Sequence, residues 1–295
     1  MITIMGASGH TGAKIAEALL NAGEKVRAVG RTESKLAAFS RAGADVWIGD
    51  AADSMFLTNA FRGADAVYTL VAPDPSSADY RAAQDEQGAA IATAIRDSGV
   101  RHVVALSSLG ADRAEPFGVI AGLRAQEERL RRLSHAHVTI LRPASFFENL
   151  ESAPGLIKEL GLVGDAVTAN LPIPMVATRD IADIATAALR SRDWNGIVVR
   201  ELLGPRDISY SEATRLLGEK IGKPDLTYVQ FPDDEMMSAM VTSGLSQSFA
   251  ALYVEMTRAI NAQQLQPQNG RSLANRTPTR FEEFVDELAR TYQAM

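Results

Sequence analysis

Three glycines between the first expected strand and the first expected helix constrain this chain more than any other feature. The loop reads Gly6-Ala7-Ser8-Gly9-His10-Thr11-Gly12 and directly follows the apolar segment Ile2–Met5. In such a unit, one glycine permits a tight turn, one lets main-chain NH groups approach a pyrophosphate, and one allows close helix–strand packing. A turn without a ligand is the alternative, but three glycines would then cost conformational entropy without return. The loop therefore predicts a dinucleotide-binding site.

Short apolar runs alternate with longer amphipathic segments over the first 150 residues. The pattern predicts strands at Ile2–Met5, Lys25–Val29, Asp45–Ile48, Ala66–Leu70, His102–Leu106 and Val138–Leu141. It predicts helices at Thr11–Ala22, Ser34–Ala42, Asp53–Phe61, Asp79–Ser98 and Gly122–Leu133. Regular alternation of this kind is typical of an α/β fold, in which helices cover both faces of a doubly wound parallel sheet.

The second half has a looser rhythm. We expect an irregular stretch over 151–176, punctuated by glycine and proline, and then a helix at Asp180–Leu189 and a strand at Ile197–Leu202. Further helices are expected at Ser211–Ile221, Asp233–Val241, Phe249–Ala262 and Pro278–Tyr292, with a short strand at Tyr228–Phe231. Ser209 or Ser211, and also Asp180, are expected helix caps, and Pro278 is placed in a first helical turn. The predicted domains are 1–150, to which 177–201 return, and a smaller, mostly helical domain made of 151–176 and 202–295.

Composition excludes several classes of protein. The chain has 295 residues, of which 46% are hydrophobic, so it can bury a full core. It contains no cysteine, which excludes disulfides, thiolate metal sites and cysteine nucleophiles. The net charge of −6 and the lack of a basic run argue against nucleic-acid binding. No apolar stretch is long enough to span a membrane and no secretory signal is readable, so we expect a cytoplasmic protein.

The end of the second strand predicts the choice of cofactor. An NAD-binding fold usually has an acidic residue here, on the adenine ribose, but this chain has Arg31, with Lys35 four residues later. A guanidinium offers a bidentate fork to a 2′-phosphate, so NADP(H) is favoured over NAD(H). Glu33 is a counter-argument, because it could reach a ribose hydroxyl. Asp50, just past the third strand, is expected either at the adenine amino group or in a turn.

Ligands of open α/β sheets bind outside the carboxyl ends of the strands. The fourth, fifth and sixth strands end in Val71, Ala72 and Pro73, in Ser107, Ser108 and Leu109, and in Arg142, Pro143, Ala144, Phe146 and Phe147. These segments are therefore expected beside the reacting part of a bound cofactor.

Four segments together resemble the NmrA-like branch of the atypical short-chain dehydrogenase/reductases. They are Gly6–Gly12, Val29–Arg31, Leu141–Asn149 and Val176–Ala182. The resemblance covers nearly the whole chain and is least specific over the last fifty residues. It is closest in style to type 2 quinone oxidoreductases and to NADPH-dependent azo or triphenylmethane dye reductases. It implies a Rossmann-type domain, a smaller C-terminal substrate domain, and a nicotinamide side lined by Val71–Pro73, by Ser107 and Ser108, and by Pro143–Phe147.

Many reductases of that wider group use a serine with a Tyr-x-x-x-Lys pair, in which the tyrosine is the general acid. None of the six tyrosines here has a lysine four residues later, and the predicted helix after the fifth strand contains neither residue type. Ser107 and Ser108 are therefore only weak catalytic candidates. Ketone reduction needs a proton delivered in place, whereas a quinone or azo product anion is delocalised. The missing pair therefore argues against an alcohol dehydrogenase.

Other candidates have simpler explanations. His10 is expected either to face the phosphates or the cleft, or to be an exposed loop residue. His135 and His137 share a strand face but lack a third metal ligand, so no metal site is predicted. The charged run Glu127–Arg132 is interpreted as a solvated helix face, and Asn149 as an anchor for the chain more than a ligand contact. One apolar set suits either a pocket for flat aromatic acceptors or core packing: Met236, Met237, Met240, Phe249, Tyr253 and Met256.

Two functions remain open from the residues. One is an NADPH-dependent oxidoreductase that passes hydride to a small quinone-like or azo-like acceptor. The other is a non-catalytic NADP(H) sensor of the NmrA type, which acts through a regulatory protein partner. The enzyme is preferred because the C-terminal half is large enough to build a substrate pocket. A homodimer is compatible with either function.

Overall fold

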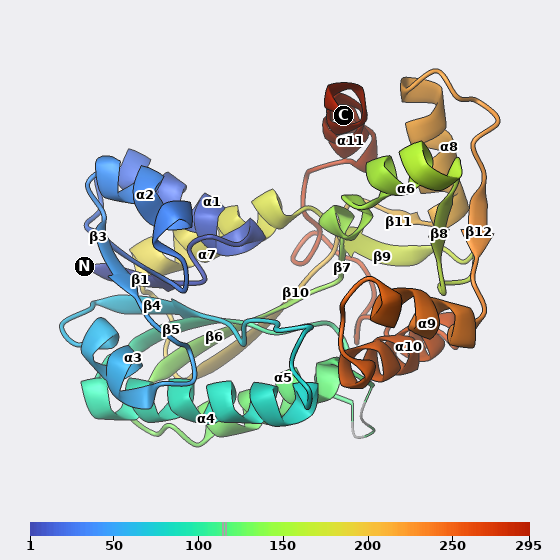
Figure 1. Ribbon diagram of the computed structural model, residues 1–295. Helices are drawn as coiled ribbons and strands as arrows, with labels where there is room; N and C mark the ends of the chain where they lie inside the picture. The colour runs from blue at the N-terminus through green and yellow to red at the C-terminus, as the bar shows by residue number, and fades with distance from the viewer. Residues whose placement is uncertain (114, 116) are drawn as a thin grey trace.

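Seven parallel strands form the larger sheet in the computed structural model of the chain, which describes residues 1–113, 115 and 117–295 (Figure 1). Their order is β10-β6-β5-β4-β1-β2-β3. The strands are β1 (Ile2–Met5), β2 (Val26–Gly30), β3 (Asp45–Ile48), β4 (Ala66–Thr69), β5 (His102–Leu106), β6 (His137–Pro143) and β10 (Ile197–Leu202). The sequence prediction of a doubly wound parallel sheet is confirmed.

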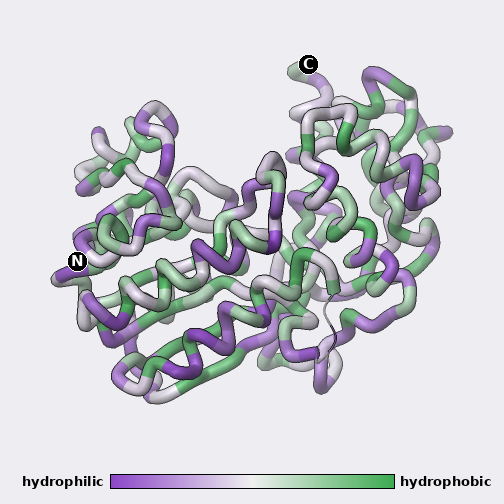
Figure 2. The backbone as a smooth tube through the Cα atoms, turned by 60° about the horizontal axis from the view of Figure 1, so that its bottom comes forward, coloured by the Kyte–Doolittle hydropathy of each residue, from purple (hydrophilic) through white to green (hydrophobic). Residues whose placement is uncertain are grey.

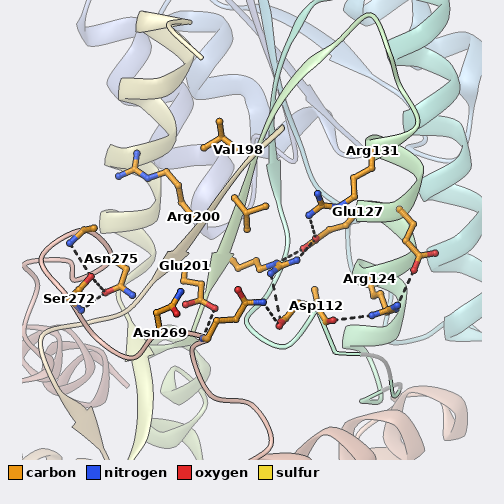
Figure 3. Close-up of a pocket in the computed structure, with 16 residues that line it drawn as sticks. Asp112, Arg124, Glu127, Arg131, Val198, Arg200, Glu201, Asn269, Ser272 and Asn275 are labelled. Atoms are coloured by element: carbon orange, nitrogen blue, oxygen red, sulfur yellow. Dashed lines mark hydrogen bonds and ion pairs between the residues drawn. The ribbon is translucent and has the colours of Figure 1, made fainter. Parts of the chain in front are cut away.

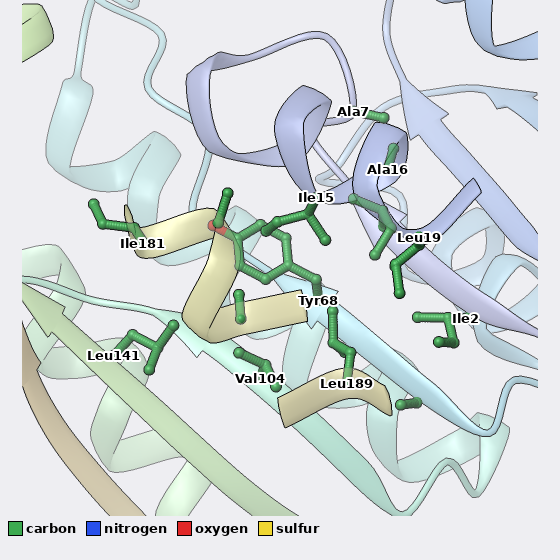
Figure 4. Packing of buried hydrophobic residues seen from close by; sticks show 14 of the residues in the cluster. Ile2, Ala7, Ile15, Ala16, Leu19, Tyr68, Val104, Leu141, Ile181 and Leu189 are labelled. Carbon is green, nitrogen blue, oxygen red and sulfur yellow. The ribbon is translucent and has the colours of Figure 1, made fainter. Parts of the chain in front are cut away.

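Helices cover both faces of this sheet. One face carries α1 (His10–Asn21), α2 (Glu33–Arg41) and α7 (Thr178–Ser191), and the other carries α3 (Ser54–Phe61), α4 (Tyr80–Ser98) and α5 (Ile120–Arg131) (Figure 1). On the first face, Ile15 of α1 and Ile181 of α7 pack around the fully buried ring of Tyr68 (Figure 4). Burying such side chains stabilises the fold by about 1.5–3 kcal/mol each. This packing fixes α1, and with it the glycine loop, against the sheet.

The rest of the chain forms a second lobe beside the carboxyl ends of these strands (Figure 1). Its small sheets are β11-β9-β7, made of β7 (Ser145–Phe146), β9 (Ile173–Val176) and β11 (Asp207–Ile208), and β12-β8, made of β8 (Val163–Asp165) and β12 (Tyr228–Gln230). Its helices are η1 (Phe147–Leu150), α6 (Ala153–Leu160), α8 (Tyr210–Lys220), α9 (Asp233–Thr242), α10 (Gln247–Asn261) and α11 (Phe281–Ala294). A separate core of aromatic and aliphatic side chains holds this lobe together.

Hydrophobic residues run along the strands and the inward helix faces, while hydrophilic residues mark the loops and outer turns (Figure 2). Within the described residues, no helix is both long and apolar enough to cross a bilayer. The strand β10 pairs in parallel with β6, and α7 packs on the same face as α1. Residues 177–201 therefore contact the large sheet, as the predicted return of this segment to the first domain requires. The domain boundaries themselves stay a prediction.

Three sequence expectations about local structure are wrong. Residues 151–176 are not irregular: Pro154 lies in the first turn of α6, and Gly161 ends that helix at φ 72°. Pro154 and Gly161 thus mark the start and the end of a helix, whereas the sequence suggested a loop. The last helix begins at Phe281, after Pro278. Asp180 lies inside α7 and does not cap it; its carboxylate instead accepts hydrogen bonds from the main-chain NH and the hydroxyl of Thr279. The expected cap of α8 is confirmed: of the two serines proposed, Ser209 is the cap.

Candidate functional site

The three glycines of the loop have different surroundings. Gly6 adopts φ +61°, which only glycine reaches without strain. A Cβ on Gly12 would lie 2.2 Å from the carbonyl oxygen of Gly6, so α1 can approach the loop only without a side chain there. A Cβ on Gly9 would meet nothing nearer than 3.4 Å. Gly9 is therefore open toward solvent. Without a side chain there, a ligand in the solvent can approach the main chain of the loop closely.

The N-terminus of α1 is left available for an anion. Gly9 is its N-cap, no side chain bonds the first NH groups, and the first turn of α1 holds no acidic residue. The hydroxyl of Thr11 lies 2.8 Å from that of Tyr68 and is buried, so it is turned away from the loop surface. Ser8, Gly9 and His10 are exposed. Unpaired NH groups together with the helix dipole favour a phosphate at this position.

A cavity of about 540 Å³ lies between the glycine loop, the strand ends of the large sheet and the second lobe. Among the predicted cofactor residues, those that border it are Gly6, Gly9, His10, Thr11, Val71, Pro73, Ser107, Pro143 and Phe146. Those outside its lining are Ala7, Ser8, Gly12, Arg31, Lys35, Asp50 and Ala72. The fold thus brings the loop and three strand ends to one space, as expected for an open α/β sheet.

The opposite wall of this cavity comes from the second lobe. Phe249, Tyr253, Met256 and Ile260 border it from α10. Their spacing of four, three and four residues puts them on one helix face, and the sequence carried that signal. Met236, Met237 and Met240 of α9 do not border it. Residues that sequence analysis missed, such as Tyr80, Gln84, Val167 and Tyr210, come from elements far apart in the chain.

Charge is nearly absent from the lining of this cavity. Among its described lining residues there is no Asp, Glu, Lys or Arg; the polar groups are hydroxyls, amides and His10. The imidazole of His10 is half exposed and lies 3.7 Å from the carboxylate of Glu151. Asn149 borders the cavity as well. Burial and the charge of Asp74 raise the pKa of Tyr80 to about 12, so its hydroxyl stays neutral. Such a lining suits a neutral, flat, apolar ligand.

Arg31 and Lys35 lie on the surface at the end of β2 and at the start of α2. Hydrogen bonds from Ser76 hold the pKa of Asp74 below its usual range, and the charge of Arg31 adds to this effect. Arg31 is therefore near enough to Asp74, in the loop after β4, to affect the charge of that carboxylate. The carboxylate of Asp50 accepts a hydrogen bond from the NH of Ala52 at 2.9 Å and so forms a turn.

Glu127 is not part of a solvated helix face, contrary to the sequence interpretation. It is 4% exposed, and its Oε1 accepts a hydrogen bond from the Ser107 hydroxyl at 2.6 Å. The guanidinium of Arg142 donates to both carboxylate oxygens, at 2.8 and 2.7 Å. The sequence did not reveal the burial of Glu127, because a charged residue at an inward position of a helix cannot be told by type from its charged, exposed neighbours.

This ion pair borders a second cavity of about 1000 Å³, where Glu127 and Asp112 belong to a network of charged side chains (Figure 3). Burial lowers the pKa of Arg142, but the bonds to Glu127 and the charge of Asp112 outweigh this and raise it. Glu127 is therefore bound to a permanent cation and is not a free base for Ser107. None of the described glycine-loop residues borders this second cavity.

His135 and His137, for which the sequence predicts no metal site, both contact main-chain groups. The ring of His137 accepts a hydrogen bond from the NH of Gly196 at 3.0 Å, and that of His135 lies 3.3 Å from the carbonyl of Ile95. Within the part of the chain that the structure describes, no three His, Asp or Glu side chains gather in a group that could hold a metal ion.

Sequence comparisons with known proteins identify a family and relatives of this chain. The pattern of the NmrA-like family matches residues 1–285. A (4-alkanoyl-5-oxo-2,5-dihydrofuran-3-yl)methyl phosphate reductase from Streptomyces griseus is 35% identical over 225 residues, 76% of this chain and 75% of that protein. An NAD(P)H azoreductase from Xenophilus azovorans is 25% identical over 85% of this chain and 84% of its own.

The fold is shared with solved structures. An NADPH-dependent quinone oxidoreductase from Escherichia coli, complexed with NADPH, superimposes with a TM-score of 0.80 at 23% identity and covers 98% of this chain and 99% of its own. A Citrobacter triphenylmethane reductase complexed with NADP(H) gives 0.80 at 20% identity, over 98% and 100% of the two chains.

Proposed function

The chain belongs to the NmrA-like family, and we propose that within this family it is an NADPH-dependent reductase of a flat, neutral quinone-like or azo-like acceptor. That it is an NAD(P)H-dependent oxidoreductase follows from its relatives, which are themselves named reductases. The observation that carries the acceptor class is the uncharged, aromatic-walled cavity between the glycine loop and α10.

The residues present fit a dinucleotide. Gly9 leaves open the space that a side chain would fill, and the free N-terminus of α1 offers NH groups to a pyrophosphate. Arg31 is exposed at the end of β2, where an acidic residue would select NAD(H). Bound NADPH supplies the hydride, and the protein supplies position and surroundings.

Ser107 is in this proposal a positioning residue. The Ser107 hydroxyl donates a hydrogen bond to Glu127, so toward the cofactor it can only accept one through its oxygen. Because Arg142 neutralises Glu127, nothing in this pair deprotonates the serine. The hydroxyl of Ser108 donates to the carbonyl of Leu109 at 3.0 Å and is likewise engaged.

The acceptor is proposed to be conjugated because the sequence lacks the Tyr-x-x-x-Lys pair, which protonates an alkoxide as it forms in many related reductases. A delocalised product anion needs less help than an alkoxide, whose formation without a general acid loses roughly 10²–10⁴ in rate. The named substrate of the Streptomyces relative carries oxo, alkanoyl and methyl phosphate groups on a dihydrofuran ring, and the Xenophilus relative is named for the reduction of azo compounds. Both names indicate conjugated acceptors, which supports that part of the proposal. The neutrality of the acceptor rests on the uncharged cavity of this chain alone.

A screen of NADPH oxidation against small quinones, azo dyes and aliphatic ketones tests this function. We expect turnover with a quinone or azo dye and rates at least about a hundredfold lower with ketones. Ser107→Ala and Ser108→Ala should each change quinone turnover by less than about tenfold, because these residues orient the cofactor. Tight NADPH binding without turnover of any acceptor would contradict the enzyme and favour the sensor.

A further inference from the structure

A tyrosine and a carboxylic acid meet at the wall of the cavity that faces the second lobe. The hydroxyl of Tyr253, on α10, lies 2.7 Å from Oδ2 of Asp165, the last residue of β8. Tyr253 borders the cavity, whereas Asp165 does not. The pair thus connects the acceptor space to a group behind its wall.

The surroundings of Asp165 contain no opposite charge. Its Oδ1 accepts a hydrogen bond from the NH of Ala166 at 2.7 Å, and it faces the phenols of Tyr210, Tyr228 and Tyr253. No ion pair among the described residues includes Asp165. Burial raises the pKa of this carboxyl, against the opposing effect of the hydrogen bonds from Tyr253 and from two main-chain NH groups.

We propose that Tyr253 donates the proton to the oxygen of a carbonyl-conjugated acceptor in this cavity, and that Asp165 is the acid that returns a proton to Tyr253. This inference rests on the proposed reductase function and narrows its substrates to quinones and enones. No lysine among the described residues lies beside Tyr253 to lower its pKa, and burial raises that pKa, so it is a weaker acid than the tyrosine of a Tyr-x-x-x-Lys pair. Reduction of an aliphatic ketone to an alkoxide therefore stays slow, whereas a delocalised product anion can be protonated in place.

The protonation state of Asp165 decides whether this transfer can occur. A phenol has one proton, so an ionised Asp165 would hold it and leave none for the acceptor. A protonated Asp165 donates to the phenol oxygen instead, and the phenol proton is then free to point into the cavity. Tyr253 therefore acts as a donor only at pH values below the raised pKa of Asp165.

The reaction balances with groups already named. The acceptor gains a hydride at carbon from NADPH, and its carbonyl oxygen takes the electron pair and then the phenol proton. The O–H bond of Tyr253 breaks as that of the product forms, the acid proton of Asp165 passes to the phenolate, and water reprotonates Asp165. A triphenylmethane dye differs, because hydride addition to its central carbon gives a neutral product without any proton. The single positive charge of such a dye is delocalised over its aryl rings, so the aromatic side chains of this uncharged cavity can hold the dye as they hold a neutral acceptor.

This difference gives an experiment with an internal control. Tyr253→Phe should lower kcat/KM for an enone or a quinone by about tenfold or more, and should change that for a cationic triphenylmethane dye by less than about twofold. Tyr292→Phe is the control: Tyr292 lies on α11, outside the lining of the cavity, so the ratio of the two rates should stay at the parent value. Equal losses with both acceptors, or no loss with either, would overturn the proposal.

A second experiment tests Asp165 and includes a readout without turnover. The kcat/KM for the enone should fall as pH rises through the pKa of Asp165, and Asp165→Asn should remove that limb while NADPH affinity stays within about threefold. In the cofactor-free protein, infrared difference spectra should show a protonated carboxyl that disappears in Asp165→Asn. An ionised Asp165 throughout the active pH range would overturn the relay. If the parent protein did not bind NADPH at all, the proposed reductase function itself would be refuted.

Discussion

At the scale of single residues, we propose that Arg31 determines the preference for NADPH over NADH. It follows β2 at the surface, where a guanidinium is free to form two bonds to a 2′-phosphate. Arg31 could be proposed from the sequence alone, because the length of one βαβ unit sets the number of residues between the glycine loop and the end of the second strand. What the sequence could not provide was its environment, since the neighbouring Asp74 comes from the loop after β4.

Arg31→Ala should narrow the preference for NADPH over NADH. Losing a charge-assisted bidentate contact costs about 1.5–3 kcal/mol, or about 10- to 150-fold in NADPH affinity, and should leave NADH affinity little changed. Calorimetric titration of both cofactors measures the effect, with Arg41→Ala, an exposed arginine at the end of α2, as the control. Equal affinities of the unmutated protein for the two cofactors would refute the assignment of Arg31.

Asp165 also predicts how stability depends on pH. Because its pKa is raised in the folded state, the folded protein binds the proton more tightly than the unfolded chain does. Its contribution is therefore most favourable below the ordinary pKa of an aspartate and is lost as pH rises through the raised value. Asp165→Asn should raise the melting temperature at pH 8 by a few degrees and by less at pH 4, as differential scanning calorimetry would show. A larger gain at pH 4 would reverse the sign and exclude the raised pKa.

At the scale of elements, the junction of β1 with α1 separates binding from folding. Gly9 and Gly12 lie in the same loop, but only a side chain at Gly12 would collide with the main chain. The spacing alone predicted that the three glycines have different roles, because the geometry of a glycine loop is local, but it did not assign each role to a residue. The α6, β8 and β9 elements escaped prediction for the opposite reason: they are short, and their glycines and prolines act as caps within a tertiary context.

Two substitutions test that separation. Gly9→Val should keep the fold, since its backbone lies at φ −98°, ψ 175°, and should abolish NADPH binding by filling the pyrophosphate's approach. Gly12→Val should instead destabilise the protein by about 3 kcal/mol or more, because its Cβ would lie 2.2 Å from a carbonyl oxygen. Urea unfolding and cofactor titration distinguish the two. A folded Gly9→Val protein with unchanged NADPH affinity would show that the site is misplaced.

The Glu127–Arg142 pair ties α5 to β6 and is a second element-scale test. The two side chains are 5% and 6% exposed, and without Arg142 the only ion pair that the buried Glu127 carboxylate keeps among the described residues is the longer contact of 3.4 Å to Arg131. Arg142→Met should therefore cost about 3–5 kcal/mol of unfolding free energy, whereas Glu127→Met combined with Arg142→Met should recover most of it. A double-mutant cycle in urea measures the coupling. Additive losses would mean that the pair is not coupled in the folded protein.

At the scale of the whole molecule, the cavity is built from segments that the sequence keeps far apart. The glycine loop, the ends of β4, β5 and β6, and one face of α10 meet only after folding. Sequence analysis predicted the first two groups because parallel strands end at one edge. It could not choose among the aromatic and methionine residues of α9 and α10, and it had no signal for Asp165, which sits alone in a stretch rich in glycine and proline.

One substitution tests the central claim, that this cavity holds the acceptor beside the cofactor. Met256 of α10 borders the cavity, and Met236 of α9 does not. Quinone-dependent NADPH oxidation should be lost or its KM raised by about tenfold or more in Met256→Trp, with NADPH affinity within about threefold of the parent and Met236→Trp unaffected. Unchanged kcat and KM for the quinone in a folded Met256→Trp protein would contradict the placement of the acceptor and, with it, the proposed active site.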